Sequence, residues 1–123
     1  MSLELTEREL DVMEVLWEQG SGTVSEVRRR MPDRLAYTTV LTVLRTLETK
    51  EMVRHEGEGK AYRYLPLVRR EDVVHGAVKR LMGRLFSGSP ELLVTHLVSD
   101  HKVDAGELRR LRRMLDTRLK DKS

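Results

Sequence analysis

Residues 37–50 read YTTVLTVLRTLETK, and the two faces of this stretch decide the fold of the chain. Val40, Val43, Leu44 and Leu47 recur at the spacing i, i+3, i+4 and i+7, which predicts one buried stripe of an amphipathic helix. Threonine is a poor helix former because its β-branch restricts the side chain against the preceding turn. A threonine-rich face on a helix is therefore a departure from local preference, which is typical of a functional surface. That face consists of Thr38, Thr39, Thr42, Arg45, Thr46 and Thr49.

The chemistry of this polar face suits the major groove of DNA. Threonine hydroxyls reach phosphates or base edges, threonine methyls contact thymine methyl groups, and an arginine can donate two hydrogen bonds to guanine. The alternative is an ordinary half-buried helix whose threonine face meets another protein. With its neighbours, the face predicts DNA binding by Tyr37, Thr38, Thr39, Thr42, Arg45, Thr46, Lys50, Arg54, Lys60 and Arg63.

Length and composition set the class of protein. The 123 residues are 39% hydrophobic and 35% charged, which fits one small domain, with or without an appendage, that builds a modest core. The sequence contains no cysteine, so disulfides and thiolate metal sites are excluded. No apolar run approaches the length of about 18 residues that a transmembrane helix needs. The acidic N-terminus has no signal-peptide pattern, so we expect a cytoplasmic protein without a membrane partner.

Charge is distributed unevenly along the chain. Residues 1–27 contain one basic and seven acidic side chains, whereas residues 28–63 contain nine basic and five acidic ones. Residues 64–123 contain thirteen basic and eight acidic side chains. The net charge becomes positive just ahead of the threonine-faced helix. This asymmetry is typical of a surface that binds nucleic acid.

Two capping boxes predict two short helices ahead of residues 37–50. Thr6 with Glu9 and Thr23 with Glu26 both follow the pattern T-x-x-E, and a glycine and a proline then end the two helices. Two short helices and a turn ahead of a helix whose polar face suits the DNA major groove predict a helix-turn-helix. The apolar residues expected inside the first helix are Leu10, Met13, Leu16 and Trp17.

A glycine-rich turn after the third helix predicts a β-hairpin. Residues 53–56 and 61–65 are the expected strands, joined by the turn 57–60. A hairpin directly after a recognition helix is a wing, in which Lys60 at the tip and Arg54 or Arg63 on the strands can meet phosphates or a minor groove. The alternative is a plain hairpin that only covers the core.

The chain after residue 67 predicts three more helices with more apolar surface than they can bury alone. Ser89 with Pro90 and Asp104 with Glu107 mark the starts of the last two. A two-fold homodimer with a shared core is the simple solution, and it would present two recognition helices to half-sites about 34–36 Å apart. The predicted dimerisation residues are Val74, Val78, Leu81, Leu85, Leu93, Leu97, Leu108, Leu111 and Leu115.

These patterns predict a mainly α protein in two parts. Residues 1–67 are expected to form a winged helix-turn-helix domain of three helices and a β-hairpin wing, and residues 68–123 an α-helical dimerisation domain. The patterns also predict a homodimer that binds double-stranded DNA through two recognition helices.

The sequence resembles the penicillinase-repressor family of bacterial transcription regulators, the BlaI/MecI/CopY type. The resemblance covers nearly the whole chain. It is carried by LTERELDVMEVLWEQG (5–20), AYTTVLTVLRTLETKEMV (36–53), KAYRYLPLVRRED (60–72) and ELLVTHLVSDHKVDAGELRRLRRML (91–115).

The resemblance implies a homodimeric transcriptional repressor with a winged-helix N-terminal domain and a helical dimerisation domain, bound to double-stranded DNA that carries a palindromic operator. This chain also departs from the family at several positions. Some members are cleaved at an Asn-Phe bond after a membrane sensor detects a β-lactam; that position aligns with His96 and Leu97, and the pair is absent. The upstream protease or sensor is not identified by the sequence. Copper-responsive members carry a C-terminal cysteine cluster, which this chain lacks. Some members also carry a basic residue where this chain has Leu41 and Thr46.

Other function classes find little support in the sequence. No phosphate loop, G-x-S-x-G elbow or H-E-x-x-H motif is present, so we expect neither an enzyme nor a cofactor. His96, Asp100 and His101 are the one metal-like cluster; no metal is predicted because a third firm ligand is missing. Two alternatives stay open: a winged helix for protein–protein interaction, and a regulator that responds to a small molecule.

Overall fold

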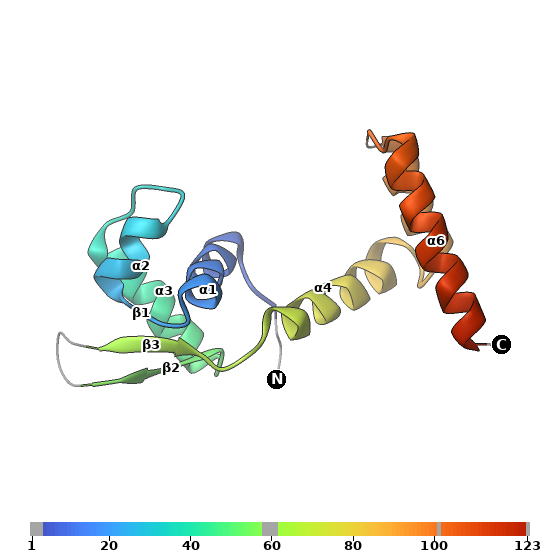
Figure 1. Ribbon diagram of the computed structural model, residues 1–123. Helices are drawn as coiled ribbons and strands as arrows, with labels where there is room; N and C mark the ends of the chain where they lie inside the picture. Colours follow the sequence, from blue (N-terminus) through green and yellow to red (C-terminus); the bar gives the residue numbers. More distant parts are fainter. Residues whose placement is uncertain (1–3, 58–61, 101, 123) are drawn as a thin grey trace. The chain divides into compact units, whose positions relative to one another are not determined.

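A computed structural model of the chain describes residues 4–57, 62–100 and 102–122. The chain divides into two compact units, residues 1–79 and 80–123, with the division inside helix α4 (Arg70–Leu85). The predicted domain boundary after residue 67 stays a prediction. The first unit (Figure 1) contains α1 (Glu7–Gln19), β1 (Gly22–Thr23), α2 (Val24–Arg30), α3 (Tyr37–Thr49), β2 (Val53–Glu56) and β3 (Arg63–Pro66), and the second contains α5 (Pro90–Asp100) and α6 (Ala105–Lys122).

Both predicted capping boxes of the helix-turn-helix are present. The Thr6 hydroxyl accepts from the Glu9 backbone N–H at 3.1 Å, while the Glu9 carboxylate accepts from the Thr6 N–H at 2.8 Å. Thr23 and Glu26 make the same reciprocal pair at the start of α2. These contacts satisfy backbone donors that a helix start leaves without partners, so the local sequence fixes where α1 and α2 begin.

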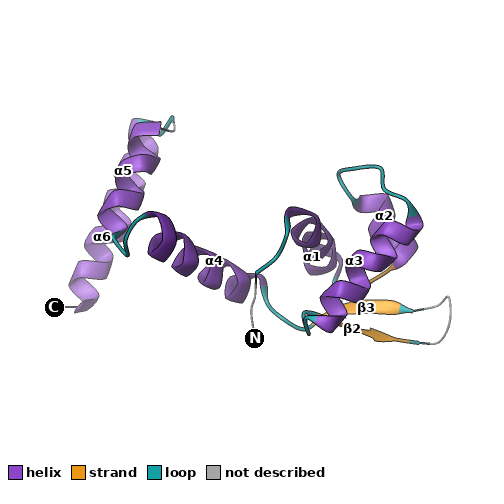
Figure 2. Ribbon diagram, turned by 180° about the vertical axis from the view of Figure 1, so that it is seen from behind, coloured by secondary structure: helices purple, strands orange, loops and turns teal. Residues whose placement is uncertain are grey.

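The sheet is small and antiparallel, with the strand order β1-β3-β2. The predicted hairpin is confirmed: His55 pairs with Tyr64, and Glu56 pairs with Arg63. The second strand runs over Arg63–Pro66, later than the expected 61–65, and Ala61 lies outside the described residues. β1 was not predicted from the sequence; its two residues pair with Tyr64 and Arg63 on the far edge of β3. Figure 2 shows this sheet beside the three helices of a winged helix-turn-helix.

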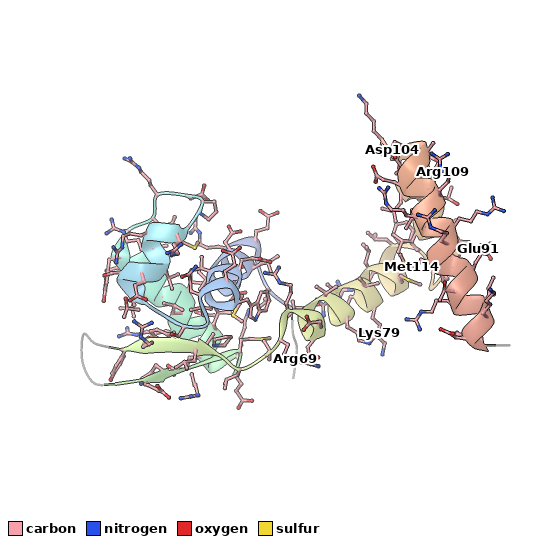
Figure 3. All side chains as sticks on the ribbon, viewed as in Figure 1. Arg69, Lys79, Glu91, Asp104, Arg109 and Met114 are labelled. Atoms are coloured by element: carbon pink, nitrogen blue, oxygen red, sulfur yellow. The ribbon has the colours of Figure 1, made fainter. Side chains whose placement is uncertain are left out.

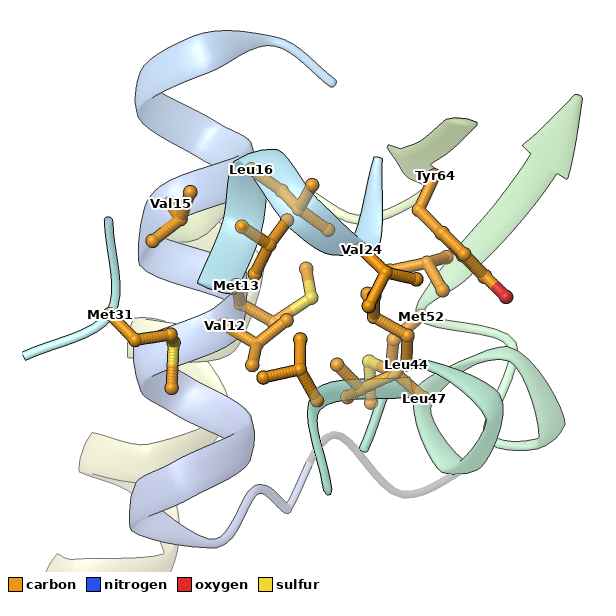
Figure 4. Packing of buried hydrophobic residues seen from close by; sticks show 13 residues of the cluster. Val12, Met13, Val15, Leu16, Val24, Met31, Leu44, Leu47, Met52 and Tyr64 are labelled. Carbon is orange, nitrogen blue, oxygen red and sulfur yellow. The ribbon is translucent and has the colours of Figure 1, made fainter. Parts of the chain in front are cut away.

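The core of the first unit is built around α3. Val40, Leu44 and Leu47 of the predicted stripe are fully buried, and they pack with residues of α1, α2 and both hairpin strands (Figure 4). Val43, the fourth residue of the stripe, is half-buried against the same cluster. The expected stripe of α1 was wrong at one position, because Leu10 is 38% exposed. The helix instead buries Val12, Met13, Val15 and Leu16. Packing against α2 and α3 rotates the buried face of α1 away from Leu10.

Helices α5 and α6 of the second unit are nearly bare in the single chain. Neither contains a buried residue, and apolar side chains such as Met114 on α6 stand exposed (Figure 3). The predicted helix starts are present: the Ser89 hydroxyl accepts from the Leu92 N–H at 3.2 Å, and Asp104 accepts from the Glu107 N–H at 2.8 Å. Within the described ranges, no helix is both long and apolar enough to cross a membrane.

Candidate nucleic-acid interface

The outward face of α3 is the centre of the candidate interface. The apolar stripe on the opposite side of α3 is packed in the core, which fixes the rotation of the helix about its axis. Its polar face therefore points outward. Thr39 is half-buried on this face. The exposed residues are Tyr37, Thr38, Thr42, Arg45, Thr46 and Thr49.

Three of the five threonine hydroxyls of α3 donate their protons to backbone carbonyls within the helix. Thr42 donates to the Thr38 carbonyl at 2.9 Å, and Thr46 donates to the Thr42 carbonyl at 3.0 Å. Thr49 donates to the Arg45 carbonyl at 3.1 Å. Each hydroxyl oxygen therefore keeps acceptor capacity, and the methyl groups remain available for apolar contact. This face can accept from base amino groups and touch thymine methyls, but it offers few donors of its own.

Arg45 supplies the donor capacity that the threonines lack. Its side chain is exposed, and it forms no hydrogen bond or ion pair with any residue that the structure describes. An arginine carries five N–H donors in a fixed fork, which matches either guanine or a phosphate. Arg45 is therefore the strongest single candidate for a direct contact with DNA.

Lys50, also predicted to bind DNA, has a partner inside the fold. Its ammonium lies 2.7 Å from the carboxylate of Glu9, which is buried at the start of α1. Burial alone would raise the pKa of Glu9, but the hydrogen bonds from Lys50 and Thr6 outweigh it and the net pKa is lowered. Lys50 thus ties the end of α3 to the start of α1.

Arg63 has a similar internal partner. Its two terminal nitrogens donate to the two carboxylate oxygens of Glu26 at 3.1 and 2.8 Å, and one of them also donates to the Ser21 hydroxyl at 3.0 Å. The hydrogen bonds from Arg63 lower the pKa of Glu26. This forked pair joins β3 to the start of α2, so part of the Arg63 charge is neutralised before any DNA arrives.

The wing is joined to the recognition helix through His55. Its Nδ1 lies 2.5 Å from the Glu48 carboxylate of α3, and its ring stacks on Tyr62 with centroids 4.2 Å apart. Arg54 pairs with Glu56 on the same strand at 2.8 Å, with both side chains largely exposed. Lys60, the predicted tip residue, lies outside the described residues.

A second group of basic residues was missed as a candidate site. Arg28, Arg29 and Arg34 line a cavity of about 530 Å³ at the end of α2, where Arg28 donates to the Leu35 carbonyl at 2.7 Å. The run of three arginines at 28–30 was visible in the sequence, but it was counted only as net charge. Its position at the loop leading into α3 makes it a candidate for phosphate contacts.

The predicted dimerisation residues are unburied in the single chain. Leu93 is half-buried, and the rest are exposed, up to 71% for Leu85. They lie on three helices, at Val74, Val78, Leu81 and Leu85 on α4, Leu93 and Leu97 on α5, and Leu108, Leu111 and Leu115 on α6.

The position that aligns with the cleavage bond of some family members, His96–Leu97, lies on α5, and so does Asp100 of the metal-like cluster. His96 and Leu97 are both exposed, and His96 Nδ1 lies 2.9 Å from the Asp100 carboxylate. The His96 ring also contacts Phe86. His101 lies outside the described residues. Among the residues that are described, no group of three His, Cys, Asp or Glu side chains could hold a metal ion.

Comparison with known proteins gives one consistent family. The family described as penicillinase repressor matches residues 5–117. The transcriptional regulator BlaI of Mycobacterium tuberculosis is 37% identical over 115 residues, covering 90% of this chain and 82% of that protein. The penicillinase repressor of Bacillus licheniformis is 23% identical over 115 residues, covering 92% of this chain and 90% of that protein.

A solved structure supports the fold. A MarR family protein from Bacillus stearothermophilus superposes with a TM-score of 0.50 at 22% identity, covering 94% of this chain and 76% of that one. At this identity the likeness concerns the fold alone.

Proposed function

The chain belongs to the penicillinase-repressor family of transcriptional regulators, and on this premise we propose that it represses transcription as a homodimer bound to an inverted-repeat operator. The observation that carries the proposal is the outward face of α3. One side of this helix packs in the core, and the other presents threonine methyls, hydroxyl acceptors and the exposed guanidinium of Arg45. This combination matches the base edges of a major groove.

Positioning on the duplex falls to residues around α3. Tyr37 and Thr38 lie at its first turn, where helix-turn-helix proteins approach the bases, and Arg54 lies on the wing. In this proposal Tyr37 and Thr38 lie near base edges, whereas Arg54 contacts phosphates and fixes register without reading sequence. Lys50 and Arg63 contribute less in this proposal, because Glu9 and Glu26 already hold them.

Dimerisation is supported by the apolar residues of the C-terminal helices. Exposed apolar patches of this extent are uncommon on monomeric proteins, and a second copy of the chain offers the same surface in return. A two-fold dimer carries two copies of α3 to two half-sites of opposite orientation. This is the geometry that an inverted repeat requires.

The test is selection of binding sites from random duplexes by the purified protein, followed by binding measurements on the recovered sequence. We expect an inverted repeat and a steep fall in affinity with salt. Arg45→Ala should cost about 1–3 kcal/mol of binding free energy and relax the preference at one base position per half-site.

Arg69→Ala is the matched control, because Arg69 is exposed at the start of α4 and pairs with Asp72. It should leave the sequence preference unchanged. If Arg45→Ala preserved both affinity and preference, α3 would not be the reading surface. Recovery of no common sequence and binding to no duplex at low salt would instead favour a protein-interaction module.

A further inference from the structure

A cleft lies beside the reading face, between α3, the start of α2 and β3. Its volume is about 600 Å³, which falls within the range of small-molecule sites in proteins. The cleft belongs entirely to the first unit. It is lined by Val24, Ser25, Tyr37, Leu41, Arg45, Tyr62 and Tyr64.

The floor of the cleft contains the phenol ring of Tyr64. Tyr64 is 1% exposed and belongs to the core, yet its hydroxyl forms no hydrogen bond within the described part of the chain. Figure 4 shows this hydroxyl at the edge of the core cluster, pointing away from the other side chains. No buried side-chain nitrogen or oxygen of the described residues lacks a partner, so the Tyr64 hydroxyl must open onto accessible space. Because Tyr64 lines the cleft, its hydroxyl is available there to a ligand that offers a hydrogen-bond acceptor.

The protonation state of this hydroxyl makes it a donor. Burial raises the pKa of Tyr64 above its ordinary value, and the nearby Glu48 carboxylate raises the pKa further. The phenol therefore stays protonated throughout the neutral range. It can donate its proton to an acceptor that enters the cleft.

The other lining residues define the shape and charge of a ligand. The rings of Tyr37 and Tyr62 and the apolar side chains of Val24 and Leu41 favour a flat, apolar body. The guanidinium of Arg45 favours an anionic group, and a carboxylate suits its fork best. We propose that this cleft binds a small aromatic carboxylate, whose anionic group lies between Arg45 and the Tyr64 hydroxyl and whose ring lies between the tyrosines.

The location of the cleft gives the ligand a consequence for DNA binding. Arg45 and Tyr37 line the cleft and also belong to the reading surface, so one copy of Arg45 cannot serve both partners. This step rests on the proposed function. The ligand and the operator then exclude each other directly, and the apparent dissociation constant for DNA rises in proportion to ligand concentration once the cleft is saturated.

Tyr64→Phe removes only the hydroxyl from the floor of the cleft, and so tests its part in ligand binding. The ring stays in the core, and the hydroxyl has no partner to lose, so the thermal stability of the free protein should not fall. Affinity for the carboxylate should fall about tenfold, as expected for a lost hydrogen bond to a charged group. Tyr62→Phe is the matched control: it removes a hydroxyl from the wall but keeps the ring that stacks on His55, so affinity should stay near wild type.

The experiment titrates naphthoate, and naphthamide as its uncharged counterpart, into the DNA-free full chain, and follows the backbone amide resonances of Leu41 and Arg45. We expect saturable chemical-shift changes with naphthoate and much weaker changes with naphthamide. In Tyr64→Phe, the affinity for naphthoate should fall about tenfold. Equal binding of the two probes, absence of shifts with naphthoate, or unchanged affinity in Tyr64→Phe would overturn the site.

A second titration, in the presence of duplex DNA, tests competition. Naphthoate should weaken DNA binding in wild type and do so about tenfold less effectively in Tyr64→Phe. If naphthoate binds while DNA affinity is unchanged, the site stands and the competition is refuted. If the chain binds naphthoate but no duplex at all, the failure belongs to the proposed function.

Discussion

Glu9 and Glu26 each take part in one local interaction and one that joins distant parts of the chain. As third residues of capping boxes, both accept from the backbone of the threonine that starts their helix. Each also holds a basic side chain far along the sequence, Lys50 in one case and Arg63 in the other. The two carboxylates thereby link the starts of α1 and α2 to the end of α3 and to β3. The recognition helix and the wing are positioned from their ends by these pairs.

Substitution of Glu9 should reveal this link through pH. The pKa of Glu9 is lowered in the folded chain, so its ionised form contributes stability above its unfolded pKa, and this contribution is lost as pH falls through the folded pKa. Glu9→Gln should lower the free energy of unfolding by about 1–2 kcal/mol at neutral pH, since one partner stays partly exposed. Urea unfolding should show a shallower loss of stability below about pH 5 than in wild type.

Glu7→Gln is the control for that experiment, because Glu7 is exposed in the same turn of α1. Its stability profile between acid and neutral pH should follow that of wild type. An equally steep acid loss in Glu9→Gln and in wild type would show that other carboxylates govern the acid transition.

Sequence reasoning succeeded for single residues where the relevant partner is near in the chain. The threonine and glutamate of a capping box are three positions apart, so the pattern can be read directly from the sequence. The partner of Lys50 is 41 residues away and that of Arg63 is 37 residues away. No local rule relates such pairs, and both basic residues were therefore assigned to DNA alone. The Tyr64 hydroxyl escaped notice for the same reason, since its lack of a partner is a property of the folded chain.

The end of α3 contains a strained residue. Glu51 lies between the end of α3 and the start of β2, and its φ of 63° is in the left-handed region. The Met52 N–H donates to the Leu47 carbonyl at 2.9 Å across this reversal, which closes the helix. A residue with a Cβ costs about 1–2 kcal/mol in this conformation, and glycine avoids that cost.

Glu51→Gly should therefore stabilise the chain. The relief of strain is partly offset by the greater flexibility of glycine in the unfolded chain, so we expect a net gain of about 0.5–1 kcal/mol by thermal or urea unfolding. Glu51→Ala keeps the Cβ and should give no comparable gain. If alanine stabilised the chain as much as glycine, removal of the glutamate side chain would be the cause, and the backbone would not be strained.

Helices were predicted better than the parts that connect them. The stripe of Val40, Leu44 and Leu47 has the helical period and is buried as expected. The stripe of α1 is ambiguous because apolar residues lie on more than one side, and only packing decides that Leu10 is exposed. The two-residue strand β1 has no pattern of its own; it exists because Gly22 and Thr23 pass beside β3.

At the scale of the whole molecule, the two units differ in how much of their apolar surface is buried within one chain. The first unit has a closed core of residues from its helices and hairpin. No residue of α5 or α6 is fully buried in the single chain, although apolar side chains recur along both helices. In the dimer proposed above, a second chain would cover these apolar side chains. The sequence predicts this need but does not specify how two copies fit together.

The last prediction concerns that cover. Leu111 is one of the predicted dimerisation residues on α6, with Leu108 and Leu115, and it is exposed in the single chain. Leu111→Glu should place a charge in the dimer core and give a monomer at micromolar concentration by analytical ultracentrifugation, because an unpaired buried charge is strongly unfavourable. Operator affinity should fall by about 10²-fold or more, since the two half-sites no longer bind as one unit. Thr117→Glu adds the same charge to the opposite face of α6, so it should stay dimeric and keep wild-type affinity. A dimeric Leu111→Glu protein would place the interface elsewhere, whereas a monomeric wild type that still bound the full operator tightly would remove the need for two-fold symmetry.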